Sequence, residues 1–130
     1  MIDIASNIEI FYSYSSKDEK YRIEIEKQLK ILERQGLISG WHFRKIASGK
    51  EWEKEINQHI NSARITLLLI SANFLSSDYC FDKEMARAFE RYDANECLIV
   101  PIILKPCLWE KDLRLEKLNV LPLRSPFGLG

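Results

Sequence analysis

The chain of 130 residues lacks most of the features that would assign it to a specialised class of protein. Its three cysteines, Cys80, Cys97 and Cys107, are odd in number and form no CxxC spacing, so we expect neither a disulfide framework nor a zinc knuckle. Nineteen basic and 19 acidic residues cancel, whereas a general nucleic-acid-binding protein depends on a basic field. The composition therefore excludes disulfide-rich proteins and argues against a broad nucleic-acid-binding surface.

Long hydrophobic runs are also missing. The longest apolar segments, Ile65–Ile70 and Leu98–Leu104, are far shorter than the ~20 residues that a membrane helix requires. No basic region followed by an apolar one stands at the N-terminus, so no secretory signal is expected. With 46% hydrophobic and 29% charged residues, the sequence predicts one globular domain in the cytoplasm.

Four segments have the composition of buried strands, and they are residues 8–12, 37–43, 64–70 and 98–104. Pro101 lies in the fourth of them, which indicates an edge position or a bulge. A small fifth strand is predicted at residues 121–123, after one or two short helical turns between Trp109 and Leu118.

Helical patterns alternate with these strands. Ser16 with Glu19, and Ser48 with Glu51, have the spacing of a capping box, and Gly36 supplies a helix stop. A loop is expected at Ser71–Ser77. The predicted inner faces are Tyr21, Ile25, Leu29 and Leu32 in the first helix, Trp52, Ile56, Ile60 and Ala63 in the second, and Phe81, Met85, Ala88, Phe89 and Tyr92 in the third.

This order of elements predicts an α/β fold with a mainly parallel sheet and helices on both faces. Functional sites in such folds lie at the carboxyl ends of the strands. A phosphorelay receiver domain needs carboxylates there, but the first and third strands end in Tyr12–Ser15 and Ser71–Asn73. Neither GxGxxG nor a Walker A loop is present, and His42 and His59 show no pairing with a cysteine, so we expect surface or structural roles for them.

Glu84 is the most informative position in the third helix. At roughly 100° per residue it lies about 80° from the centre of the apolar stripe, one turn after Cys80. A carboxylate there would be partly desolvated and could meet a polar ligand near the strand ends. Alternatively, Glu84 flanks the core and pairs with Arg87 three residues later.

Four segments in order resemble the conserved boxes of Toll/interleukin-1 receptor (TIR) domains. Residues 8–19 resemble the first box, and residues 41–52 resemble the second, which contains the BB loop. Residues 67–85 and 100–109 are similar to the third-strand and fourth-strand segments of bacterial members. The resemblance covers residues 7–123 and implies the flavodoxin-like TIR fold, with four to five strands.

The resemblance also implies an activity, because many TIR domains hydrolyse NAD+ at the bond between nicotinamide and ribose. Their essential glutamate lies on the third helix, where this chain has Glu84. The products would be nicotinamide and either ADP-ribose or a cyclic isomer, with NAD+ as substrate and neither cofactor nor metal required. Bacterial members suggest a role in antiphage defence. The alternatives are a non-catalytic scaffold acting by TIR–TIR contact and a sensor that binds a nucleotide messenger without cleaving it.

Other substrate-binding positions follow from the same resemblance. Tyr14 and Ser15 would line the nicotinamide-ribose pocket, although an ordinary capping turn is the alternative. Arg44 and Lys45 would hold the diphosphate, with solvated loop charges as the alternative.

The third-helix segment adds two candidates for the pocket. Cys80 stands where several catalytic members have Trp and is expected to be a buried helix cysteine, while Tyr79 would supply the aromatic surface. Trp41 and Trp52 are expected to serve in packing.

Two departures from the family pattern bear on these expectations. Phe43 and Ser48 replace the usual Asp and Pro of the second box; Ser48 still caps the next helix, whereas Phe43 removes a charge on which BB-loop contacts and substrate affinity depend. The usual last helix does not appear, so residues 1–130 read as one TIR domain without that helix or as a module of a longer chain. The expected partners are NAD+, further TIR domains through residues 44–50, and a fused or separate sensor domain, with neither nucleic acid nor a membrane bound directly.

Overall fold

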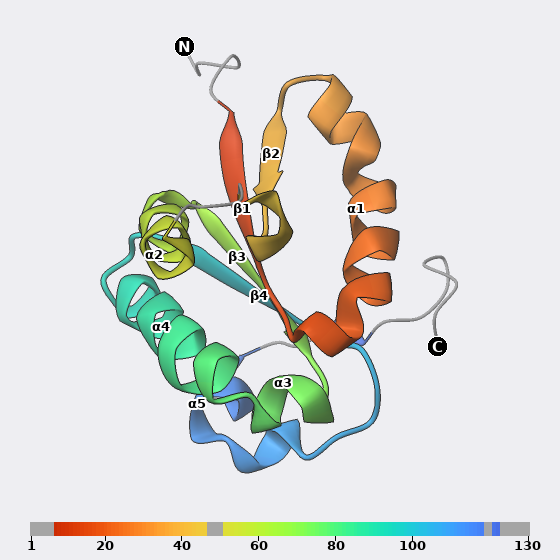
Figure 1. Cartoon of the computed structure of the whole chain (residues 1–130). Coiled ribbons are helices and arrows are strands. Elements are labelled where there is room, and N and C mark those ends of the chain that lie inside the picture. The colour runs from red at the N-terminus through yellow and green to blue at the C-terminus, as the bar shows by residue number, and fades with distance from the viewer. Residues whose placement is uncertain (1–6, 47–50, 119–120, 123–130) are drawn as a thin grey trace.

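The centre of the protein is a parallel sheet, seen in a computed structural model that describes residues 7–46, 51–118 and 121–122 (Figure 1). Its strands are β1 (Ile8–Ser13), β2 (Ile38–Trp41), β3 (Ile65–Ile70), β4 (Leu98–Ile103) and β5 (Leu121–Pro122). Within the described residues the strand order is β2-β1-β3-β4-β5, and each neighbouring pair is parallel. The predicted fold class is therefore confirmed, because this is the flavodoxin-like order.

Helices cover both faces of the sheet, as Figure 1 shows, with α1 on one face and α2 and α4 on the other. The longer helical elements are α1 (Glu19–Arg34), α2 (Trp52–Ser62), the π-helix η3 (Asp78–Met85) and α4 (Ala86–Asp93). The short ones are η1 (Ser16–Asp18), η2 (Phe43–Lys45), α3 (Ala72–Ser76), η4 (Trp109–Lys111) and α5 (Leu113–Glu116).

Strand β3 explains why the core has two halves. Alternate side chains of a strand point to opposite faces, so Leu67 and Leu69 pack in the cluster that includes Ile25 of α1. Leu68 and Ile70 pack in the cluster on the other face, which includes Met85 and Ala88 and extends to α5. An almost entirely apolar run, interrupted by the buried Thr66, suits this strand because both of its faces are covered.

Pro101 does not mark an edge strand or a bulge, so that expectation is wrong. Strand β4 lies between β3 and β5, and its register with β3 runs without a break from Leu98 to Ile103. The amide groups of Leu98 and Leu104 donate to Arg64 and Ile70 on the β3 side. Backbone groups alternate between the two neighbouring strands, and residue 101 is three positions from both Leu98 and Leu104. Its backbone therefore faces β5, where the described pairing begins only at Ile102. The missing N–H of proline therefore removes no bond to β3.

The connections differ from prediction in several places. Ser15 rather than Ser16 caps the first helical turn, and its Oγ accepts from the amide of Lys17. The segment predicted as a loop at Ser71–Ser77 contains α3, capped by Ser71. Strand β2 stops at Trp41, before the short turn η2.

The predicted helix stop at Gly36 is confirmed by its φ of 74°. The second predicted capping box includes Ser48, which lies outside the described residues. The carboxyl-terminal segment after Pro122, where the usual last helix was expected to be missing, also lies outside them.

No helix within the described ranges is both long and apolar enough to cross a membrane.

Candidate functional site

Glu84 is buried at the carboxyl end of β1. The π-helix η3 places it there with 8% of its surface exposed, and its Oε1 accepts a hydrogen bond of 2.7 Å from Ser13 Oγ. The alternative pairing with Arg87 does not form, since Arg87 donates to Asn61 and pairs with Glu90. The geometry therefore favours a site residue over a side chain that merely flanks the core.

The Glu84 carboxyl holds its proton more tightly in this buried environment than it would in water. Burial raises its pKa from the ordinary 4.5 to about 7, against the opposing effect of the Ser13 hydrogen bond. Among the described residues no basic side chain contributes to this pKa. Burial, together with the Glu84 charge, raises the pKa of Tyr79 and of Cys80 to about 12 each, so both remain protonated at neutral pH. A carboxyl that titrates near pH 7 in a pocket is typical of functional sites.

A cavity of about 380 Å³ opens in front of Glu84. It joins the loop after β1, the turn η2, the helix α2 and the π-helix η3. Five predicted site residues line it, and they are Tyr14, Ser15, Tyr79, Cys80 and Glu84. The other lining residues are Ser16, Phe43, Ile46, Trp52, Ile56 and Ser77.

Aromatic rings form two walls of this cavity. Trp52 and Tyr79 lie with their ring centres 5.0 Å apart, and Tyr14 and Phe43 lie 5.2 Å apart. The prediction of a packing role is wrong for Trp52, which is 53% exposed and lines the cavity, whereas Ile56 and Ile60 of the same helix are buried in the core. The same prediction is right for Trp41, which is buried and stacks on Phe11.

The π-helical backbone explains how Tyr79 reaches the cavity together with Glu84. In a π-helix the hydrogen-bonded pair is five residues apart, and these two residues have that spacing. The ordinary α-helical period used for the sequence pattern aligns only Cys80 with Glu84. Cys80 is buried as expected, and its thiol donates to the carbonyl of Tyr14 over 3.2 Å.

Arg44 and Lys45 do not line the cavity in this structure. Arg44 Nε lies 2.5 Å from Glu19 Oε2, and Lys45 Nζ donates to the carbonyl of Gly40. Their predicted role as diphosphate ligands therefore requires both side chains to leave their present partners. Both residues are exposed, with 56% of the Arg44 side chain accessible, so the alternative of solvated loop charges describes them in this structure.

Sequence patterns missed two polar residues beside the site. Ser13 is fully buried in β1, where nothing in the sequence signals its hydrogen bond to a residue 71 positions away. Asp18 is also buried, and it accepts hydrogen bonds from Ser71 Oγ (2.5 Å) and Asn73 Nδ2 (3.1 Å). Asp18 thereby joins the loop after β1 to the loop after β3, and its place in a presumed capping turn was the only available signal.

Neither histidine lines this cavity, in agreement with their expected structural roles. His42 is buried, and burial lowers its pKa to about 4, so it is neutral. His59 stacks on Trp41 at 4.3 Å and pairs with Glu9. In the parts of the chain that are described, no group of three or more His, Cys, Asp or Glu residues could hold a metal ion.

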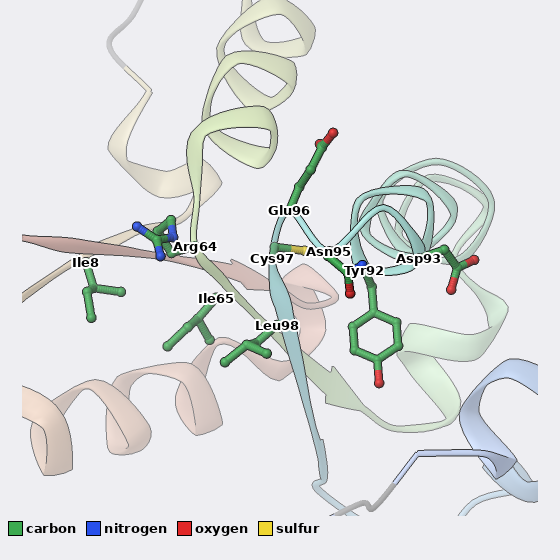
Figure 2. Close-up of a pocket in the computed structure, with 9 residues that line it drawn as sticks. All are labelled: Ile8, Arg64, Ile65, Tyr92, Asp93, Asn95, Glu96, Cys97 and Leu98. Atoms are coloured by element: carbon green, nitrogen blue, oxygen red, sulfur yellow. The ribbon is translucent and has the colours of Figure 1, made fainter.

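A second hollow of about 720 Å³ lies at the opposite, amino-terminal end of the strands (Figure 2). Ile8, Ile65 and Leu98 line it where β1, β3 and β4 begin. Its polar lining residues are Arg64, Asp93, Asn95 and Glu96, and Figure 2 shows the Glu96 side chain pointing away from Ile65 and Leu98. None of the predicted site residues lines this hollow.

The flavodoxin-like sheet, with its polar site at the carboxyl ends of the strands, defines an α/β domain of the doubly wound class. Within that class the family model described as "TIR domain" matches residues 10–127. The chain therefore belongs to the TIR-domain family.

Its relatives include bacterial and animal proteins. The chain is 48% identical over 113 residues to the uncharacterised protein y4lF of Sinorhizobium fredii, covering 87% of this chain and 35% of that protein. It is 29% identical over 100 residues to Toll-like receptor 4 of Pinctada imbricata, covering 75% of this chain and 11% of the receptor. The chain thus spans only a minor part of each of these relatives.

Two solved structures share the fold. The TIR domain of the Toll-related receptor TRR-2 from Hydra magnipapillata superposes with a TM-score of 0.66 at 23% identity, covering 87% of this chain and 82% of that one. The TIR domains of the activated Roq1 resistosome, which directly recognises the pathogen effector XopQ, give 0.64 at 22% identity, covering 81% and 63%. At these identities the likeness concerns the fold alone.

Proposed function

We propose that this TIR domain cleaves NAD+ at the bond between nicotinamide and ribose. The observation that carries the proposal is the environment of Glu84. It is a buried carboxylate with one hydrogen bond, from Ser13, and no basic group among the described residues contributes to its pKa. The negative charge of ionised Glu84 therefore has no positive partner among the described residues, and a cationic group of a ligand would supply one.

The nicotinamide end of NAD+ carries the positive charge and the flat ring that would suit this cavity. Its pyridinium ring is flat and positively charged, so it can stack between aromatic walls such as Tyr14–Phe43 and Trp52–Tyr79. The volume of about 380 Å³ lies within the ~300–1,000 Å³ usual for small-molecule sites, which suits part of a dinucleotide.

A single carboxylate suffices for this cleavage because nicotinamide leaves as a neutral molecule and needs no general acid. As the bond to C1′ lengthens, positive charge moves from the ring to the ribose, and ionised Glu84 stabilises it. Water capture gives ADP-ribose, whereas capture by another nucleophile of the same molecule gives a cyclic isomer. NAD+ is the substrate in this scheme, and no cofactor takes part.

The family also supplies the biological proposal. Assembly through TIR–TIR contacts that include residues 44–50 would raise the activity, and a fused or partner sensor would trigger it. This chain covers 35% of a related bacterial protein, which is consistent with a TIR module in a longer signalling protein. The proposed role is antiphage defence, and the proposed location is the cytoplasm.

The deciding experiment measures nicotinamide release from NAD+ by concentrated protein under crowding, with products separated by chromatography. We expect Glu84→Gln to abolish release while its circular dichroism spectrum stays that of the wild type. Glu90→Gln is the matched control, since Glu90 is an exposed acid on α4, and it should retain activity. Equal, non-zero rates in wild type and Glu84→Gln would remove Glu84 from the mechanism. No turnover by protein shown to be assembled would favour the scaffold.

A further inference from the structure

Ser13 and Glu84 come from different layers of the fold and meet beside the cavity, which Glu84 lines and Ser13 does not. Ser13 is the last residue of β1 and pairs in register with Leu68 of β3, so the rigid centre of the sheet fixes its position. Glu84 lies on the π-helix, and the two side chains are joined by the hydrogen bond of 2.7 Å between Ser13 Oγ and Glu84 Oε1.

The hydrogen bond makes the two carboxylate oxygens of Glu84 different, because only Oε1 accepts from Ser13. Ser13 is completely buried, whereas Glu84 retains a small exposed fraction and lines the cavity. Oε1 is occupied by the serine hydroxyl, and no described residue donates to Oε2. A carboxylate free to rotate would present either oxygen, but one held at Oε1 presents Oε2 in a defined direction.

We propose that Ser13 is the positioning residue of this site: it anchors Oε1 of Glu84, directs Oε2 at the ligand and favours the ionised carboxylate. The inference rests on the proposed function for its catalytic meaning. The geometry of the pair stands without that function.

No other described side chain lining the cavity carries a charge that could stabilise ionised Glu84. Tyr79 and Cys80 from η3 face the same cavity, and both are neutral at physiological pH. From the loop after β1 come Tyr14, Ser15 and Ser16, from η2 Phe43, and from α2 Trp52 and Ile56, none of which is charged at neutral pH. Within the described residues, the Ser13 hydrogen bond is the only influence that lowers the pKa of Glu84 against burial.

The test is a direct titration of Glu84, which needs no turnover. Protein labelled with carbon-13 at the glutamate carboxyl is titrated by NMR, and Glu84→Gln identifies the resonance. We expect a midpoint near pH 7 in the wild type and a shift of roughly one pH unit upward in Ser13→Ala, because a hydrogen bond to an ionised group is lost. Ser13→Thr keeps the hydroxyl and should restore the wild-type midpoint.

Two further variants keep the test decisive. Ser13→Cys retains the size but donates weakly, so it should give an intermediate midpoint even where the alanine variant folds poorly. Thr66→Val removes another fully buried hydroxyl of the sheet, from β3, and should leave the midpoint unchanged. Equal midpoints in wild type and Ser13→Ala, or in wild type and Ser13→Cys, would overturn the proposal.

Turnover separates this inference from the function on which it rests. In an active protein the rising limb of kcat/KM against pH should move upward in Ser13→Ala and return in Ser13→Thr. A shifted NMR midpoint in a protein that never releases nicotinamide would sustain the positioning role while defeating the NAD+ proposal.

Discussion

Arg44 is joined to Glu19, with 2.5 Å between Arg44 Nε and Glu19 Oε2. The other oxygen of Glu19 accepts from Tyr14 Oη at 2.8 Å and from Arg22 Nε at 2.7 Å. Glu19 thus holds the turn η2 against the start of α1 and fixes the ring of Tyr14, which lines the cavity. A diphosphate ligand that recruits Arg44 must compete with this carboxylate.

The competition predicts the effect of Glu19→Gln on ligand binding. The amide keeps a carbonyl oxygen for Tyr14 and Arg22 but no longer attracts Arg44 by charge, so Arg44 becomes available to a diphosphate. We expect ADP-ribose to bind up to about fivefold tighter by calorimetry, since an exposed ion pair is worth about 0.2–1 kcal/mol. In an Arg44→Ala background the same change should have no effect. Tighter binding in that background as well would assign the effect to Tyr14 rather than to Arg44.

The exposed ring of Trp52 predicts a change in binding without a change in stability. It is 53% exposed at the first residue of α2, so truncation opens no core cavity. We expect Trp52→Ala to raise KM for NAD+ by at least about fivefold with kcat nearly unchanged, since stacking on an aromatic ring contributes about 1–3 kcal/mol. Trp52→Phe keeps an aromatic face and should retain most of the affinity. A Tm lowered by the alanine change with KM unaltered would return Trp52 to a packing role.

The ionisation of Glu84 predicts how the reaction depends on pH. The free carboxyl has a pKa of about 7, and the proposed chemistry needs the ionised form, so kcat/KM should rise with pH and level off above about 8. Once the pyridinium ring is bound, its positive charge favours ionisation, so the midpoint of kcat should lie below that of kcat/KM. Initial rates between pH 5 and 9 measure both. A kcat/KM that falls over this range would contradict a role for the carboxylate anion.

The strands and the main packing faces can be predicted from the sequence because buried apolar residues recur with the period of the helix or strand that carries them. The apolar run of β3 and the stop at Gly36 each follow from a local rule that the tertiary structure obeys. Helix α3 escaped prediction because five residues are too few for a helical period to appear. Trp52 continues the stripe of α2 in register, yet it is 53% exposed while Ile56 and Ile60 are buried, because an apolar stripe alone does not say which of its residues the core covers.

The site was predictable only in part. The helix pattern places Glu84 at the border of an apolar stripe near the strand ends, but it is the resemblance to TIR domains that marks Glu84, Tyr14, Tyr79 and Cys80 as site residues, and all four line the cavity. The partners that define its chemistry are distant in sequence, as the Ser13–Glu84 and Arg44–Glu19 pairs show. The π-helix changes the period from the one that the sequence pattern assumes, so the pairing of Tyr79 with Glu84 appears only in three dimensions.

Glu84 also predicts a stability change that is independent of any substrate. Its pKa is about 7 in the folded protein and close to the ordinary 4.5 when unfolded, so between these values the folded chain holds a proton that the unfolded chain has lost. The stabilising contribution is complete below pH 4.5 and is lost as pH rises through 7, a change on the order of 3 kcal/mol. Glu84→Gln stays neutral throughout, so urea denaturation should find it more stable than wild type at pH 8 and nearly equal to it at pH 4.5. Glu90→Gln, at an exposed acid, should parallel the wild type across the range. A wild type more stable than Glu84→Gln at pH 8 would show that the folded protein solvates this carboxylate well, which removes the electrostatic basis for binding a cation there.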